Sequence, residues 1–310
     1  MSSFQTNENV VPEQAQAWVL QSIGKGAEWI ASNRLKGGVS AAVYGVTLRV
    51  GEDSVRVVLR LFDNEDWLRQ EPDLARHEGT VLEWVSRTDA TAPQLIAYDE
   101  TGSLAGMPAV LMSHLPGAVD LMPIDQAQWL DELAAALSRI HLTDANDLTW
   151  AYFTYQDVSV WEMPTWSVHT NDWAQIQAIV RGPRPAFDPV FIHRDYHPTN
   201  VLWEAGKISG VVDWVNACIG PAGVDVGHCR MNLALLFGTA AADQFLEAYL
   251  RHAGERFRYD PYWDVITMAN FLYGPPGVYP GWTALGVSGL TDALMAERTD
   301  HYMKSLLQRL

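Results

Sequence analysis

The sequence has little positive charge for its length. Across 310 residues, 21 lysines and arginines stand against 37 aspartates and glutamates, a formal net charge of −16. A surface that binds nucleic acid needs clustered lysine and arginine, and an anionic membrane attracts basic segments in the same way. The composition therefore argues against both as partners, and nothing in it implies a protein partner. Acidity of this size attracts cationic ligands, although it also serves solubility.

Cysteine is nearly absent as well. Cys218 and Cys229 show neither a C-x-x-C pattern nor zinc-finger spacing, so we expect both thiols to be free, buried and reduced. No apolar run is long enough to span a membrane, and the polar first residues lack the basic start of a signal peptide. These absences together predict a cytoplasmic protein.

One short stretch of the chain, residues 191–200, carries a catalytic pattern. His193, Arg194 and Asp195 are followed by Asn200 at the H-R-D-x-x-x-x-N spacing of a kinase catalytic loop, and Asp213 follows a short apolar run. A phosphoryl-transfer site needs one carboxylate to receive a hydroxyl proton, then an amide oxygen and a second carboxylate for Mg²⁺. We therefore interpret Asp195 as the catalytic base, and Asn200 and Asp213 as the metal ligands.

The residues after the loop predict a β-hairpin. Apolar runs at 201–203 and 208–212 flank a turn at 204–207 that contains a glycine. A hairpin would bring Asn200 and Asp213 to the same end, where their oxygen atoms suit Mg²⁺. His193 and His197 have the i, i+4 spacing of a helical metal pair, but Pro198 favours a loop, so we expect His193 to brace that loop instead.

These motifs resemble the aminoglycoside phosphotransferase family, whose members are small-molecule kinases with the protein-kinase-like fold. The resemblance extends along most of the chain and is carried by residues 35–40, 57–60, 76–78, 110–117, 133–141, 191–200 and 220–225. It implies an α+β, bilobal fold, in which a five-stranded antiparallel N-lobe with a helix covers residues 1–114. A mostly helical C-lobe, residues 115–310, would carry the catalytic loop and bind the acceptor.

The resemblance also implies roles for residues outside the catalytic loop. Arg60 would contact the α- and β-phosphates of ATP or GTP and pair with Glu78. Asp225 would be a buried residue that braces the catalytic loop, and His141 would be a satisfied residue at a helix end. The backbone at five positions would hold the rest of the nucleotide: Gly37, Gly38 and Ser40 with Ser113 and Leu115 at the hinge.

Two positions depart from the family pattern. Arg194 stands where the family usually has glycine, which makes the loop read like that of a protein kinase. However, Asp213 is followed by tryptophan rather than Phe-Gly, and the chain reaches Asp225 too soon for a full activation loop, so a protein kinase is not expected. Arg60 replaces the protein-kinase lysine with a bulkier, bidentate cation.

Periodicity predicts the remaining elements. Helices are expected at 12–23, 71–85, 125–141, 225–237, 240–252, 262–273 and 291–310. Strands are expected at 27–35, 42–50, 54–62, 95–98, 109–114 and 189–192, as well as in the hairpin. The segments 142–189 and 274–281 are expected to be irregular.

Three functions remain open from the sequence. The first is an ATP- or GTP-dependent O-phosphotransferase that acts on a hydroxyl of an antibiotic, an aminoglycoside or next a macrolide. The second is a kinase of an ordinary metabolite such as choline, homoserine, a sugar or a thiosugar. The third is a non-catalytic nucleotide-binding protein. Acidic residues that could face the acceptor favour a polycationic aminoglycoside slightly: Asp225, Asp243, Glu247, Glu255, Asp260, Asp264 and Asp292.

Overall fold

The computed structural model of the chain describes residues 10–35, 41–143 and 148–310. The chain divides into two compact units, Met1–Pro116 and Gly117–Leu310. Among the described residues, none of the helices combines the length and the apolar character needed to cross a membrane. Both cysteines are free and buried, as expected.

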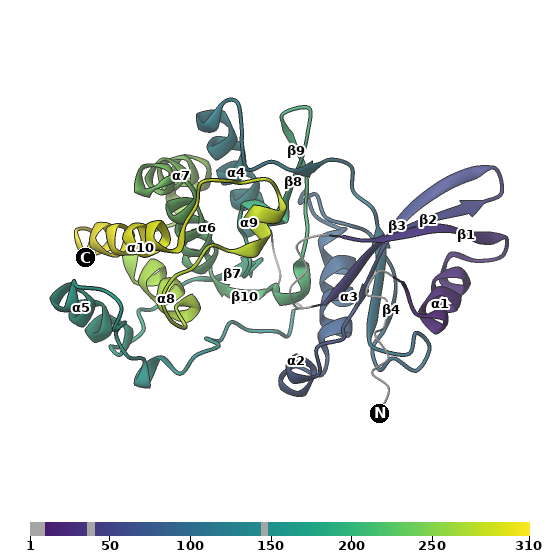
Figure 1. The fold of residues 1–310 in the computed structure, drawn as a ribbon, viewed down its shortest axis with the longest axis horizontal. Coiled ribbons are helices and arrows are strands. Elements are labelled where there is room, and N and C mark those ends of the chain that lie inside the picture. Colours follow the sequence, from purple (N-terminus) through teal and green to yellow (C-terminus); the bar gives the residue numbers. More distant parts are fainter. Residues whose placement is uncertain (1–9, 36–40, 144–147) are drawn as a thin grey trace. The chain divides into compact units, whose positions relative to one another are not determined.

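The first unit is built on one antiparallel sheet whose five strands follow the order β1-β2-β3-β5-β4. Its elements are α1 (Glu13–Ile23), β1 (Ala27–Arg34), β2 (Ala42–Val50), β3 (Asp53–Leu61), α2 (Glu65–Gln70), α3 (Leu74–Val85), β4 (Leu95–Asp99) and β5 (Ala109–Ser113). Every second residue of β2, from Ala42 to Leu48, joins the apolar core shared with α1. Figure 1 shows α1 and α3 on opposite sides of this sheet. The predicted five-stranded antiparallel sheet is confirmed.

The expected helix at 71–85 is wrong at its start. Helix α3 begins only at Leu74, and a separate helix that was not predicted, α2, ends before it at Gln70. Asn64 begins α2, because its side chain accepts hydrogen bonds from the backbone N–H groups of Asp66 and Trp67. Proline disfavours a helical conformation in the residue before it, and Glu71 accordingly has an extended φ of −130°.

The second unit is mostly helical, as predicted. Its elements are β6 (Ala118–Val119), α4 (Gln126–His141), α5 (Thr170–Val180), β7 (Pro189–Ile192), β8 (Val201–Glu204), β9 (Lys207–Val211), β10 (Cys218–Pro221), α6 (Ala222–Phe237), α7 (Thr239–Ala253), α8 (Pro261–Phe271), α9 (Pro280–Ala284) and α10 (Asp292–Leu307). Helix α6 packs against α7, α8 and α10, which buries it on almost every side (Figure 1). Strand β7 pairs with β10, while β6, β8 and β9 form a separate sheet.

Four of the elements of this unit named above were not predicted, and one of them is the two-residue strand β6. Helix α5 lies in the segment expected to be irregular, although Trp173, Ile176 and Val180 have helical spacing and are buried. Strand β10 contains glycine and proline, which form strands poorly, and it exists because it pairs with β7. Helix α9 is a short turn inside a segment rich in proline and glycine.

Candidate active site

One buried carboxylate supports the loop between β7 and β8. Asp225, in the first turn of α6, accepts hydrogen bonds from the backbone N–H groups of His193 (2.7 Å) and Arg194 (2.6 Å). It also accepts one from Nε2 of His141 (3.0 Å), whose Nδ1 lies 2.6 Å from the hydroxyl of Tyr249. His141 is therefore satisfied, as predicted, and Asp225 holds the backbone that leads to Asp195.

Arg194 adopts a left-handed backbone conformation, with φ at 68°. That conformation costs an L-residue roughly 1–2 kcal/mol, which explains a preference for glycine at this position. The side chain offers compensation, because its guanidinium carbon lies 4.0 Å from the ring centre of Phe153 and 4.3 Å from that of Tyr155. Its Nη2 also donates to the carbonyl of Phe153 (2.9 Å), and the Tyr155 hydroxyl donates to Asn216 (3.0 Å). We call Phe153 and Tyr155 the aromatic clamp.

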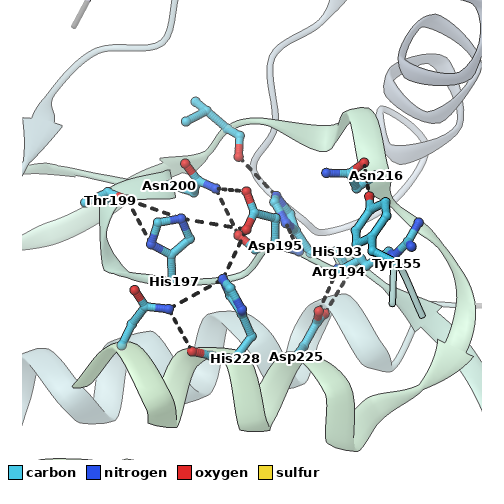
Figure 2. A network of polar contacts seen from close by, with 12 residues as sticks. Tyr155, His193, Arg194, Asp195, His197, Thr199, Asn200, Asn216, Asp225 and His228 are labelled. Atoms are coloured by element: carbon cyan, nitrogen blue, oxygen red, sulfur yellow. Dashed lines mark hydrogen bonds and ion pairs between the residues drawn. The ribbon is translucent and has the colours of Figure 1, made fainter. Parts of the chain in front are cut away.

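Asp195 projects from this loop into a set of polar neighbours (Figure 2). Its Oδ1 accepts a hydrogen bond from Nε2 of His228 (3.1 Å) and lies 3.8 Å from Nε2 of His197. The amide nitrogen of Asn200 donates to its Oδ2 (3.1 Å) and to its backbone carbonyl (2.9 Å). Burial alone raises the pKa of Asp195, but His197 and the hydrogen bond from His228 outweigh it and place that pKa below its usual range. The carboxylate is therefore ionised at neutral pH.

Two histidines thus face the same carboxylate oxygen. Burial lowers the pKa of His197 to about 4, so its ring is neutral at neutral pH. His228 must carry its hydrogen on Nε2, because an ionised carboxylate can only accept, while its Nδ1 has no hydrogen-bond partner among the described residues. The ligand atoms of Asp195, His197 and His228 lie within 4.8 Å of one another, a set that a transition metal could use.

The sequence-based reasoning missed His228. His228 belongs to no motif. Its position three residues after Asp225 on α6 is the one sequence feature that could have placed it at the site. Residues three apart on a helix share a face, so a histidine there points toward the same catalytic loop that Asp225 supports.

The hairpin brings Asn200 and Asp213 to one end, as predicted. Val212, the residue before Asp213, donates its backbone N–H to the carbonyl of Asn200 (2.9 Å). Ala205 and Gly206 connect the strands with φ angles of 49° and 75°, which define a two-residue turn that matches the strand twist. Since the amide nitrogen of Asn200 is used by Asp195, its amide oxygen remains for a ligand. That oxygen and the carboxylate of Asp213 are the hard donors that Mg²⁺ prefers, so the residues fit the ion.

His193 ties the two halves of this site together. Its Nε2 donates to the carbonyl of Val212 (3.0 Å), and its Nδ1 accepts from the backbone N–H of Asp195 (3.3 Å). The ring also lies 4.6 Å from that of Trp214. His193 therefore braces the loop, as expected, and both ring nitrogens are engaged within the protein.

The other expected site residues belong to the first unit. Arg60 on β3 and Glu78 on α3 form an ion pair, with Nε 3.4 Å from Oε2 and side-chain exposures of 8% and 1%. The backbone N–H of Ser113 donates to the carbonyl of Gln94 (2.9 Å). A purine would therefore contact the backbone of Ser113 through its carbonyl oxygen. Leu115 follows, beyond the end of β5. Gly37, Gly38 and Ser40 lie outside the described residues.

We predict that Arg60 and Glu78 act as a pair. Changing either to alanine leaves the charge of the other buried without its partner, which typically costs about 3–5 kcal/mol of folding free energy. In the double variant R60A/E78A, the decrease in the free energy of unfolding should be smaller than the sum of the decreases in the two single variants. The increase in the KM for nucleotide should be less than additive in the same way. Arg60→Lys should retain part of the activity because the charge survives. Strictly additive losses would contradict the pairing.

The sequence matches a known family. The profile of the phosphotransferase enzyme family, abbreviated APH, matches residues 33–266, a span that includes the β3 arginine, the catalytic loop and Asp225.

Solved structures with the same fold agree with this match. A Ralstonia eutropha JMP134 protein, described provisionally as an aminoglycoside phosphotransferase, is 17% identical with a TM-score of 0.62, covering 96% of this chain and 98% of its own. The macrolide 2′-phosphotransferase MphH of Brachybacterium faecium is 18% identical with a TM-score of 0.51, covering 86% and 91%. An amicoumacin kinase, solved with AMP-PNP, Ca²⁺ and Ami, is 14% identical with a TM-score of 0.56, covering 92% of each chain. The predicted fold class is thereby confirmed.

Proposed function

Because the chain belongs to the phosphotransferase enzyme family and is a small-molecule kinase, we propose that it transfers the γ-phosphate of ATP or GTP to a hydroxyl of an antibiotic. The observation that carries this proposal is the setting of Asp195. An ionised, partly exposed carboxylate is held in place by Asn200 and His228, beside two oxygen donors suited to Mg²⁺. Phosphoryl transfer needs this arrangement, because catalysis there depends on positioning and charge.

Each residue has a distinct part in the proposal. Asp195 orients the acceptor hydroxyl and receives its proton. Asn200 and Asp213 would hold Mg²⁺, which would supply positive charge to neutralise the phosphates. Arg60, fixed by Glu78, contacts the α- and β-phosphates. The backbone roles given to Gly37, Gly38, Ser40, Ser113 and Leu115 in nucleotide binding remain part of the same proposal.

The structural neighbours support an antibiotic acceptor without deciding it. One is a macrolide phosphotransferase, and another is a kinase solved with a nucleotide analogue and a divalent ion. A kinase of an ordinary metabolite would use the same nucleotide residues, because those residues handle the phosphates and a generic hydroxyl. A non-catalytic relic is disfavoured, since Asp195, Asn200 and Asp213 are all present.

Expression of the chain in a sensitive bacterium tests the proposal. Wild type should raise the inhibitory concentration of at least one aminoglycoside or macrolide, and Asp195→Ala should not. The purified protein, supplied with labelled ATP and then GTP, should phosphorylate the same drug. If label passes only to choline, homoserine or sugars, the protein is a metabolite kinase. If label passes to no acceptor, the non-catalytic alternative gains.

A further inference from the structure

A pocket of about 250 Å³ lies among α6, α8 and α10 in the second unit. Its walls are Met231 and Leu235 of α6, Met268 and Phe271 of α8, residues 272–277, and Thr299 and Tyr302 of α10. Pockets that enclose a drug-sized molecule measure about 300–1,000 Å³, so this one suits part of a ligand.

The lining of the pocket is apolar. It contains no aspartate, glutamate, lysine or arginine. Of its three side-chain hydroxyls, two are used by the protein itself, because Thr299 donates to the carbonyl of Met295 (2.8 Å) and Tyr302 donates to Asp264 (2.6 Å). The third belongs to Tyr273, whose side chain is largely exposed. Two methionines, which are flexible and polarisable, can adapt to irregular apolar shapes. The pocket therefore offers an uncharged surface to whatever enters it.

The acidic residues expected to face the acceptor have other partners. Asp264 and Asp243 both pair with the buried Arg230, at 2.6 and 2.9 Å. Asp260 caps the start of α8, and Asp292 accepts a hydrogen bond from the backbone of Val278 (2.9 Å). Asp225 holds the catalytic loop. Glu247 and Glu255 are exposed outside the pocket lining. The expectation of an acidic acceptor surface is therefore not met at this pocket.

The pocket is connected to the catalytic carboxylate by two routes. Phe271, one of its walls, lies 4.5 Å from the ring of His228, which donates to Asp195. The lining segment 272–277 continues to Tyr279, whose pKa is raised by burial and further by the charges of Asp195 and Asp213. A ligand in the pocket therefore lies next to Phe271, which contacts the histidine that donates to Asp195.

We infer that this pocket receives an uncharged, apolar portion of the acceptor. The inference rests on the proposed kinase function and narrows its substrate class. The preferred acceptor is a hydroxyl compound with a largely apolar body, rather than a polycation. Binding then depends on apolar contact with α6 and α8, and only weakly on long-range attraction to the acidic protein.

The test compares two probes of opposite character, erythromycin with its apolar lactone and single amine, and kanamycin as a polycation. Their dissociation constants are measured by calorimetry without nucleotide, for wild type and for Met231→Gln, Met231→Leu and Met122→Gln. Met231 lines the pocket and is only partly buried, whereas Met122 is 67% exposed and provides the matched control outside the lining.

Erythromycin should bind more tightly than kanamycin. Met231→Gln should weaken the binding of erythromycin at least about tenfold, because the bound ligand would cover the amide group without offering it a hydrogen-bond partner. Met231→Leu and Met122→Gln should stay within about twofold of wild type, since an apolar or exposed position is preserved. The melting temperature of Met231→Gln should stay near that of wild type, which would show that the loss of erythromycin affinity is not caused by unfolding.

The binding data and the phosphate-transfer data separate the two claims. Absent erythromycin binding, tighter binding of kanamycin, or an unchanged erythromycin affinity in Met231→Gln overturns the inference about the pocket. Transfer of label to kanamycin alone would do the same while leaving the kinase function standing. The converse result is that erythromycin binds in a way that depends on Met231 while label passes to no acceptor. That result would support the inference about the pocket and contradict the proposed function.

Discussion

Replacing Asp195 by alanine should lower turnover by about 10²–10⁴-fold while nucleotide affinity stays close to that of wild type. This range is typical for the loss of a general base. The carboxylate contacts Asn200 and His228 and is ionised at neutral pH, so it can orient a hydroxyl and accept its proton. Steady-state phosphate transfer gives the turnover, and calorimetry with a non-hydrolysable nucleotide gives the affinity.

Two further variants control this result. Asp188→Ala removes an exposed carboxylate just before β7, in the same unit, and should leave turnover unchanged. Asp195→Asn keeps the size of the side chain but removes its charge. Its NH₂ group, itself a donor, would face one of the two donors Asn200 and His228. This variant should be nearly as inactive as the alanine variant. Turnover of Asp195→Ala near that of wild type would remove Asp195 from the mechanism.

Removal of the Asp213 charge should produce a loss of about 10³-fold or more in transfer. Charge stabilisation by a divalent ion is worth several kcal/mol, and each 1.36 kcal/mol is a factor of ten in rate. Asp213→Asn is the appropriate variant, because asparagine tolerates the left-handed conformation of this position, where φ is 71°. Asn200→Ala should lose less, since a neutral amide contributes less to a divalent ion than a carboxylate does.

Magnesium titration supplies a readout that does not depend on turnover. Nucleotide affinity of the wild type should increase as Mg²⁺ is added, whereas that of Asp213→Asn should respond little. Matching Mg²⁺ dependence in wild type, Asp213→Asn and Asn200→Ala would show that these two residues are not the metal ligands.

Local patterns in the sequence predicted the elements that depend on local forces. The hairpin follows from two apolar runs around a glycine-containing turn, and it positions Asn200 and Asp213 by its own register. The alternation of β2 and the apolar face of α4 likewise report burial directly. The catalytic spacing was recognisable because Asp195 and Asn200 are separated by a single short loop.

Features that depend on distant partners could not be predicted. Strand β10 needs β7 to pair with, and its own composition disfavours a strand. The contact between His228 and Asp195 exists only once α6 lies beside the loop. Acidic residues such as Asp264 looked available in the sequence, because their partner Arg230 is revealed only by the packing of α6 and α8. The net charge of a sequence does not reveal which carboxylates form ion pairs within the fold and which are left to face a ligand.

The aromatic clamp has a consequence for the exchange of amide hydrogens. The N–H groups of His193 and Arg194 donate to the buried Asp225, so solvent deuterium can replace their hydrogens only when the loop opens. Opening must also withdraw the Arg194 guanidinium from Phe153 and Tyr155. These amides should therefore exchange as slowly as those of a helix core, unlike most surface loops, which open at little free-energy cost. The carboxylate of Asp195 is then already held in position before any ligand arrives, and ligand binding need not supply the free energy to order it.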